Sequence, residues 1–279
     1  MDTVTRFSLS HGKDRGDFPV TGRAANYSPG FLVPSHCHPT AQLIHAVQGV
    51  MVVSTDAGQW VVPPTRGLWM PPGMWHQLRM VGAVHLRTLY FRKDAHAALP
   101  CQCQVVGISP LLRELILAAV DVVPPYSEDS RDGRLMRLLL DEVASLPSLP
   151  LQLPYPADTG LRGICQRLTD QPDDHSTLED WALRLGVHGR TIERRFQRET
   201  GMTFGQWRQQ ARLVRALEFL ADGQKVVDVA LNLGYSSPSA FATMFRQQFG
   251  MPPSAYFRDA TASSRSSNHA RSSRSNSGS

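Results

Sequence analysis

The first hundred residues alternate short apolar runs with turn residues. Valine, leucine and aromatic side chains dominate six runs, which glycine and proline separate: 31–36, 41–47, 50–55, 59–64, 76–80 and 83–91. Runs of this length and composition predict β-strands. Their regular spacing indicates a β-barrel or a β-sandwich over residues 1–107.

The pattern becomes helical after residue 107. Residues 110–122 and 131–146 place apolar side chains three or four positions apart, which predicts two amphipathic helices. They serve either as a dimerisation surface or as a bracket between domains. Four prolines between Pro147 and Pro156 then exclude a helix and predict a linker that completes the segment 108–157.

The remainder of the chain divides into a helical part and a tail. Residues 158–260 are helical in pattern throughout. Residues 261–279 hold nine serines and no large apolar side chain, so we expect this tail to be disordered. The fold class is therefore α+β, with an N-terminal barrel and a C-terminal all-α domain.

An internal repeat defines the helical domain. Its first copy contains Ala182, Leu185, Gly186, Phe196 and Gly201, and its second contains Ala230, Leu233, Gly234, Phe245 and Gly250 at matching spacing. In each copy a short helix ends at a glycine that tolerates positive φ, a tight turn follows, and a second helix begins. This is the layout of two helix-turn-helix units, whose second helices enter the DNA major groove.

The helical period assigns an inner and an outer face to each second helix. Ile192 and Phe196 mark the core of the first unit, as Phe241 and Phe245 do for the second. The outer faces carry Arg190, Arg194, Gln197 and Arg198 in the first, and Ser239, Thr243, Arg246 and Gln247 in the second. Residues 204–221 form one connecting helix of about 27 Å, close to the roughly 34 Å between successive major-groove entries on one DNA face.

The positive charge is concentrated in the first unit. The chain has 29 basic and 24 acidic residues, and Arg184–Arg215 holds eight arginines against Glu193 and Glu199. A local excess of this size suits phosphate contact, although a solvated helix surface would have the same composition.

Residues 178–256 resemble the DNA-binding domain of AraC-type transcription regulators. The segments GVHGRTIERRFQRETGMTF, WRQQARLVRALEFLADG and VVDVALNLGYSSPSAF carry the resemblance. It implies base contacts by Arg190, Glu193 and Arg194 in the first unit, and by Pro238, Ser239, Ala242 and Thr243 in the second. Pro238 and Ala242 have no side-chain donor, so hydrogen-bonded readout by the second unit should be weak. Arg195 and Arg198 fit phosphate contact or pairing with Glu199 instead.

The segment from His36 to Gln42 and the later His76 resemble the two signature segments of cupins. That resemblance implies a barrel in which His36, His38 and His76 converge, and in which a glutamate would stand where this chain has Gln42. Three histidines suit a divalent metal such as zinc or iron. Alternatively, they hydrogen-bond each other or an effector inside the barrel. Trp60, Trp69 and Trp75 are expected on barrel strands, as core or as pocket lining.

These observations predict a transcription regulator rather than an enzyme. A small-molecule effector would bind in the barrel, and the helical domain would bind double-stranded promoter DNA. We expect a homodimer, and contact with RNA polymerase if the protein activates transcription. Two alternatives are a metal-dependent cupin enzyme fused to a DNA-binding domain, and an effector-independent regulator whose barrel only dimerises. Four unevenly spread cysteines and the lack of a long apolar run predict a cytoplasmic protein without a membrane partner.

Overall fold

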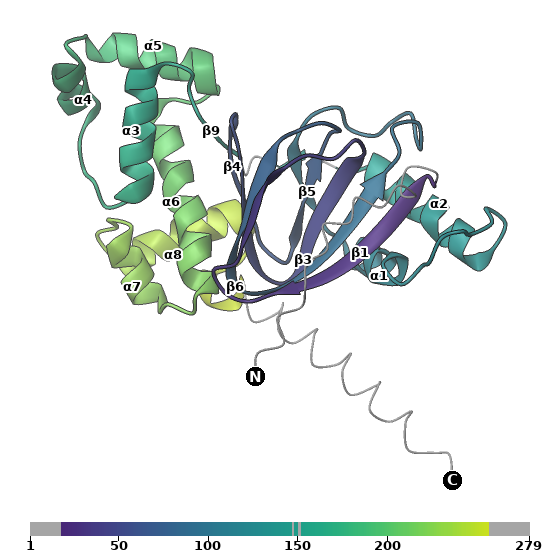
Figure 1. Ribbon diagram of the computed structural model, residues 1–279. Helices are drawn as coiled ribbons and strands as arrows, with labels where there is room; N and C mark the ends of the chain where they lie inside the picture. The colour runs from purple at the N-terminus through teal and green to yellow at the C-terminus, as the bar shows by residue number, and fades with distance from the viewer. Residues whose placement is uncertain (1–17, 147, 150–151, 257–279) are drawn as a thin grey trace.

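The computed structural model describes residues 18–146, 148–149 and 152–256. It shows a sheet domain followed by a helical domain, which confirms the predicted α+β class (Figure 1). Helices α1 (Pro110–Ala119) and α2 (Arg131–Ala144) lie on the side of the sheet domain away from the later helices. Within the described ranges, no helix has the length and apolar surface that crossing a bilayer requires. The predicted disordered tail lies outside the described residues.

In the described part of the chain, nine strands form one antiparallel sheet. They are β1 (Val20–Tyr27), β2 (Leu32–His36), β3 (Ala41–Thr55), β4 (Gly58–Val62), β5 (Arg66–Met70), β6 (His76–Phe91), β7 (Gln104–Gly107), β8 (Ser148–Leu149) and β9 (Gln152–Pro154). The main path runs β1-β6-β3-β5-β7-β8, while β2 pairs with β6, and β4 pairs with both β3 and β9. The predicted runs identified β2, β3, β4 and β6 but missed the others, whose apolar positions are fewer or interrupted by arginine and glycine.

Two long strands, β3 and β6, pair with each other within the sheet. The sequence predicted two strands within residues 41–55 and two within 76–91, but each is a single strand, β3 and β6. Register shifts on either side of Gln48 mark a bulge in β3. Gly49 there has φ +79°, and a Cβ atom would lie 2.3 Å from the Ala83 carbonyl oxygen, so only glycine fits.

The helical domain has the repeated architecture that the sequence predicts. Its helices are α3 (Thr159–Asp170), α4 (Leu178–Leu185), α5 (Gly189–Thr200), α6 (Phe204–Ala221), α7 (Val226–Asn232), α8 (Pro238–Phe249) and α9 (Pro253–Tyr256). Gly186 and Gly234 end the first helix of each unit with positive φ, and the Ser237 hydroxyl caps α8. The four predicted core residues, Ile192, Phe196, Phe241 and Phe245, are all buried.

The described end of the predicted linker packs against both domains. Its β9 strand pairs with β4, and Leu153 is fully buried. The Trp207 indole N–H donates to the Pro154 carbonyl oxygen at 2.7 Å, and one apolar cluster runs from the barrel into the helical domain. Prolines are compatible with β9 because it is an edge strand.

Helix α6 is the main contact between the domains. It packs against β3, β4, β6 and β9. The buried Glu218 carboxylate of α6 accepts hydrogen bonds from Arg79 of β6 at 2.8 Å and from Arg215 at 2.6 Å. The Tyr256 hydroxyl, 3.1 Å from the Thr65 hydroxyl, adds a second polar contact.

The packing of β9 can be tested by truncating its buried side chain. Leu153→Ala should lower the free energy of unfolding by about 2–5 kcal/mol, because it removes apolar contacts and leaves a cavity. Gln152→Ala, at the half-buried neighbouring position, should change it by less than about 1 kcal/mol. Urea denaturation measures both. Equal and small effects would mean that the segment is a loose linker.

A buried histidine predicts an acid-labile fold. Burial lowers the pKa of His45 to about 4. Between pH of about 4 and about 6.5, this histidine is therefore mostly protonated in the unfolded chain and mostly neutral in the folded chain. Stability is therefore lost as pH falls, by about 2 kcal/mol for this residue at pH 5. Urea denaturation at pH 7.5 and 5.0 should show a smaller pH dependence for His45→Gln than for the unsubstituted protein. An unchanged pH dependence would contradict this assignment.

Candidate DNA-reading helices and barrel cavity

The first DNA-reading candidate is α5. Arg190 and Arg194 are exposed on it, and among the described residues neither takes part in an ion pair. Their guanidinium groups are therefore available to bases or phosphates, as the sequence predicts.

Other polar side chains of α5 have partners within the protein. A Glu193 carboxylate oxygen accepts from the Phe204 backbone N–H at 3.3 Å, at the start of α6. The Gln197 amide donates to the Gly201 carbonyl oxygen at 3.0 Å, and Arg198 pairs with Glu199 at 2.8 Å. Arg195 pairs with Asp158 at 2.9 Å rather than with Glu199, so it ties α5 to the start of α3.

The second candidate, α8, presents a less charged surface. Ser239, Thr243, Arg246 and Gln247 are exposed, while Pro238 and Ala242 are half-buried. The α4–α5 pair and the α7–α8 pair lie near opposite ends of α6 (Figure 1). Helix α6 has 18 residues, a length of about 27 Å, which is close to the roughly 34 Å expected between two adjacent major-groove contacts.

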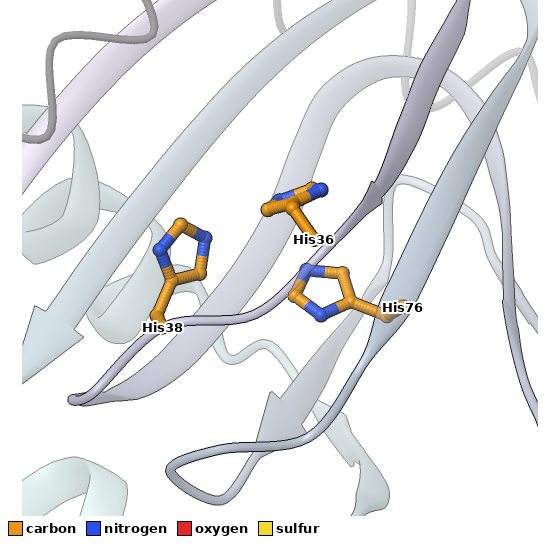
Figure 2. Close-up of side chains that lie close together, drawn as sticks. All are labelled: His36, His38 and His76. Atoms are coloured by element: carbon orange, nitrogen blue, oxygen red, sulfur yellow. The ribbon is translucent and has the colours of Figure 1, made fainter.

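The barrel brings the three predicted histidines together. Their rings face one another, with His36 ending β2, His38 in the following segment and His76 beginning β6 (Figure 2). One ring nitrogen from each lies within 4.8 Å of the others. His36 and His76 are cross-strand partners, and the Gly73 N–H donates to the His38 carbonyl oxygen at 2.8 Å, which anchors the intervening segment.

Backbone carbonyls determine the tautomers of two of these histidines. His36 Nδ1 lies 2.7 Å from the Pro34 oxygen, and His76 Nδ1 lies 2.9 Å from the Met74 oxygen. A carbonyl only accepts, so each Nδ1 carries a hydrogen, and in the neutral ring Nε2 is then the nitrogen that presents a lone pair. Burial lowers the pKa of His76 to about 4, which keeps that ring neutral near pH 7.

A cavity of about 110 Å³ extends from the histidines along the barrel interior. Three of the predicted site residues line it: His36, His38 and Gln42. The rest of the lining consists of apolar and polar side chains that the sequence analysis did not identify as site residues: Arg23, Ala25, Tyr27, Phe31, Val33, Pro34, Leu78, Leu86, Thr88 and Tyr90. The Gln42 side-chain oxygen and His76 Nε2 are buried, and neither has a hydrogen-bond partner among the residues that the structure describes. Arg23 and Tyr27 were missed because β1 was not predicted, and Tyr90 because an aromatic strand residue is usually core.

The three tryptophans differ in position. Trp60 and Trp69 are buried on strands, and the Trp69 indole N–H donates to the Pro100 carbonyl oxygen at 2.8 Å. Trp75 lies in the loop before β6 and is 60% exposed, so its placement on a strand was wrong. None of the three lines the histidine cavity.

Comparison with known proteins matches each domain to a protein family. Residues 18–146 match the family model described as an AraC-like ligand binding domain, and residues 181–259 match a helix-turn-helix domain. The HTH-type transcriptional regulator NimR of Escherichia coli is 34% identical over 223 residues, covering 80% of this chain and 81% of NimR. The activator RhaR of Mannheimia succiniciproducens is 21% identical over 255 residues, covering 85% and 91%. The structure of ToxT from Vibrio cholerae matches 86% of this chain and 98% of its own at 10% identity, with a TM-score of 0.36.

The two domains define a DNA-binding transcription regulator with an N-terminal ligand-binding domain. The chain belongs to the AraC family of transcription regulators. The relatives named above are regulators rather than enzymes, as the sequence predicts.

Base reading by α5 can be separated from its packing by two neighbouring substitutions. Arg194→Ala should weaken binding to the chain's own promoter by about 1–3 kcal/mol and relax preference at one base pair, because an exposed side chain that contacts a base edge is lost. Arg195→Ala removes the ion pair to Asp158 and should leave base preference unchanged. Binding measured on a set of single-base promoter variants checks both. If the two substitutions relaxed preference equally, the reading face would be wrongly assigned.

Proposed function

We propose that a small-molecule effector binds in the barrel cavity beside His36, His38, Gln42 and His76 and changes promoter binding by the helical domain. The observation that carries this proposal is the pair of buried, unpartnered polar atoms, Gln42 Oε1 and His76 Nε2. A buried polar atom without a partner is costly, so these atoms favour a ligand that satisfies them. The cavity adjoining the histidines gives that ligand a place.

On the DNA side, the two units have different roles in the proposal. Arg190 and Arg194 read base edges, and Arg198 and Gln197 contact the backbone beside them. In the second unit, Ser239, Thr243, Arg246 and Gln247 supply polar contacts. Pro238 and Ala242 contribute van der Waals contact alone, and Glu193 positions α6 through its hydrogen bond to Phe204.

Strand β6 supplies a route between the effector and the DNA. It begins at His76, inside the barrel, and three residues later Arg79 donates to Glu218 of α6. Side chains an odd number of positions apart point to opposite faces of a strand. A shift of β6 on effector binding would therefore move the contact with α6.

The protein acts in the cytoplasm as a homodimer in this proposal, and contacts RNA polymerase if it activates transcription. Leu111 of α1 and Leu138 of α2 are 49% and 44% exposed, on helices that face away from the DNA-binding domain. Exposed leucines on these helices support a second copy of the chain as the partner.

Blocking the cavity tests the effector site. Ala25 lines the cavity, and Ala24, its neighbour on β1, is exposed. Ala25→Phe should abolish effector response of a reporter driven by the chain's own promoter while basal promoter occupancy persists, because the added ring fills the effector's space. Ala24→Phe is the matched control and should respond normally.

A thermal-shift screen of a metabolite library would first identify the effector. A normal response from Ala25→Phe would place the sensing site outside this cavity.

A further inference from the structure

We propose that Arg212 of α6 is a positioning residue that, together with Gly234, fixes the distance and rotation between the two DNA-reading helices, α5 and α8. It thereby determines which spacing of two DNA half-sites the chain accepts. The inference rests on the proposed base reading by both units, and it adds the residues that hold the second unit in place relative to the first.

The segment between α3 and α4, residues 171–177, is held against α6 by two arginines. The Arg212 Nε–H group donates to the Pro172 carbonyl oxygen at 2.9 Å. An Nη1–H group of Arg208 donates to the Ser176 carbonyl oxygen at 3.0 Å. The two arginines are four positions apart, so they lie on the same side of α6. Both ends of this α3–α4 segment are therefore tied to the helix that connects the two units.

The Arg212 guanidinium group also contacts the turn of the second unit. Its Cζ atom lies 5.7 Å from the centroid of the Tyr235 ring, within the range of a cation–π interaction. Tyr235 packs in turn against Phe241 on the buried face of α8, with ring centroids 5.5 Å apart. At the other end of the α3–α4 segment, Thr177 caps α4 of the first unit. A chain of contacts therefore runs from the first unit through Arg212 to α8.

The two turn glycines of the repeat are packed differently. Gly186 and Gly234 occupy matching positions, with φ +64° and +70°. A Cβ atom at Gly234 would lie 3.1 Å from Arg212 Nη2 and 3.1 Å from the Asp173 Cα atom. A Cβ atom at Gly186 would meet no atom of the described residues within 4 Å. The turn of the second unit therefore lies against the α3–α4 segment, whereas the turn of the first unit is open at this point.

The surroundings of Arg212 favour a role in positioning over a role in stability. Its Nη2 atom is buried and has no hydrogen-bond partner in the part of the chain that the structure describes, which is costly. Replacing a buried charged side chain by an apolar one of similar size is often neutral for stability. Methionine at this position should therefore be tolerated, but it cannot hold the Pro172 carbonyl and the Tyr235 ring at the same time.

The experiment measures spacing preference with the full-length chain. Hydroxyl-radical footprinting first locates the two major-groove contacts of one protomer on the chain's own promoter. Duplexes are then made with the native spacing and with one base pair inserted or deleted between these contacts, which shifts one contact by about 3.4 Å and rotates it by about 35°. The unsubstituted protein should bind the altered duplexes at least tenfold more weakly, because its reading helices cannot follow this change.

Arg212→Met should reduce this spacing penalty to threefold or less, because α8 is no longer held to the α3–α4 segment. The loss of a positive charge weakens binding to all three duplexes alike, so it cancels in the ratio of affinities. Arg212→Lys keeps a donor for the Pro172 carbonyl and a cation for the Tyr235 ring, and it should retain most of the penalty. Base preference at the α5 contact should be unchanged in both variants, and circular dichroism checks that both are folded.

The two turn glycines provide a matched pair of variants that leaves Arg212 in place. Alanine is strained at a positive φ, so Gly186→Ala and Gly234→Ala should both lower the temperature of unfolding. Only Gly234→Ala should reduce the spacing penalty, by at least threefold, because its methyl group pushes the turn away from the Asp173 backbone. Gly186→Ala should keep the penalty of the unsubstituted protein.

Three results would overturn the proposal: equal binding of all three duplexes by the unsubstituted protein, a full spacing penalty in folded Arg212→Met, or equal penalties in the two glycine variants. If Arg212→Met does not fold, the glycine pair decides in the same way. Failure of the proposed base reading would be seen separately, as an unchanged base preference of Arg194→Ala.

Discussion

The buried carboxylate of Glu218 is the interaction on which the relation between the two domains depends. It lies on α6, which carries both helix-turn-helix units, and it accepts from Arg79 of the barrel and from Arg215 of its own helix. Removing one partner of a buried ion pair leaves an uncompensated charge and costs several kcal/mol. The positions of α5 and α8 relative to the barrel are therefore tied to this contact.

In the proposed regulation, the same contact gives a barrel ligand a short path to the DNA-binding domain. Strand β6 contributes His76 to the cavity and Arg79 to the domain junction. It also pairs with β1, β2 and β3, which supply most of the other cavity residues. A change in the histidine cluster therefore acts on a strand that already contacts α6, so no flexible linker has to transmit it.

Sequence reasoning predicted the helical domain more fully than the barrel, for physical reasons. Gly186, Gly234 and the phenylalanines at 196 and 245 repeat at fixed spacing, and local helix geometry converts that spacing directly into buried and exposed faces. Strand pairing depends on distant partners, so β1 and the cavity residue Arg23 were missed. His36, His38 and His76 were identified because alternation and resemblance placed them on one face. The orientation of the rings depends on the Pro34 and Met74 carbonyls, which no side-chain pattern indicates.

Proline content predicted a linker but not its packing. Pro154 ends strand β9 and accepts a hydrogen bond from Trp207. A proline lacks a donor but keeps its carbonyl acceptor, so a proline-rich edge strand can still connect two packed domains. That connection places the barrel against α6 and leaves the exposed arginines of α5 on the far part of the helical domain, where DNA can reach them. The covalent link between the domains thus supports the polar contact at Glu218 instead of separating the two cores.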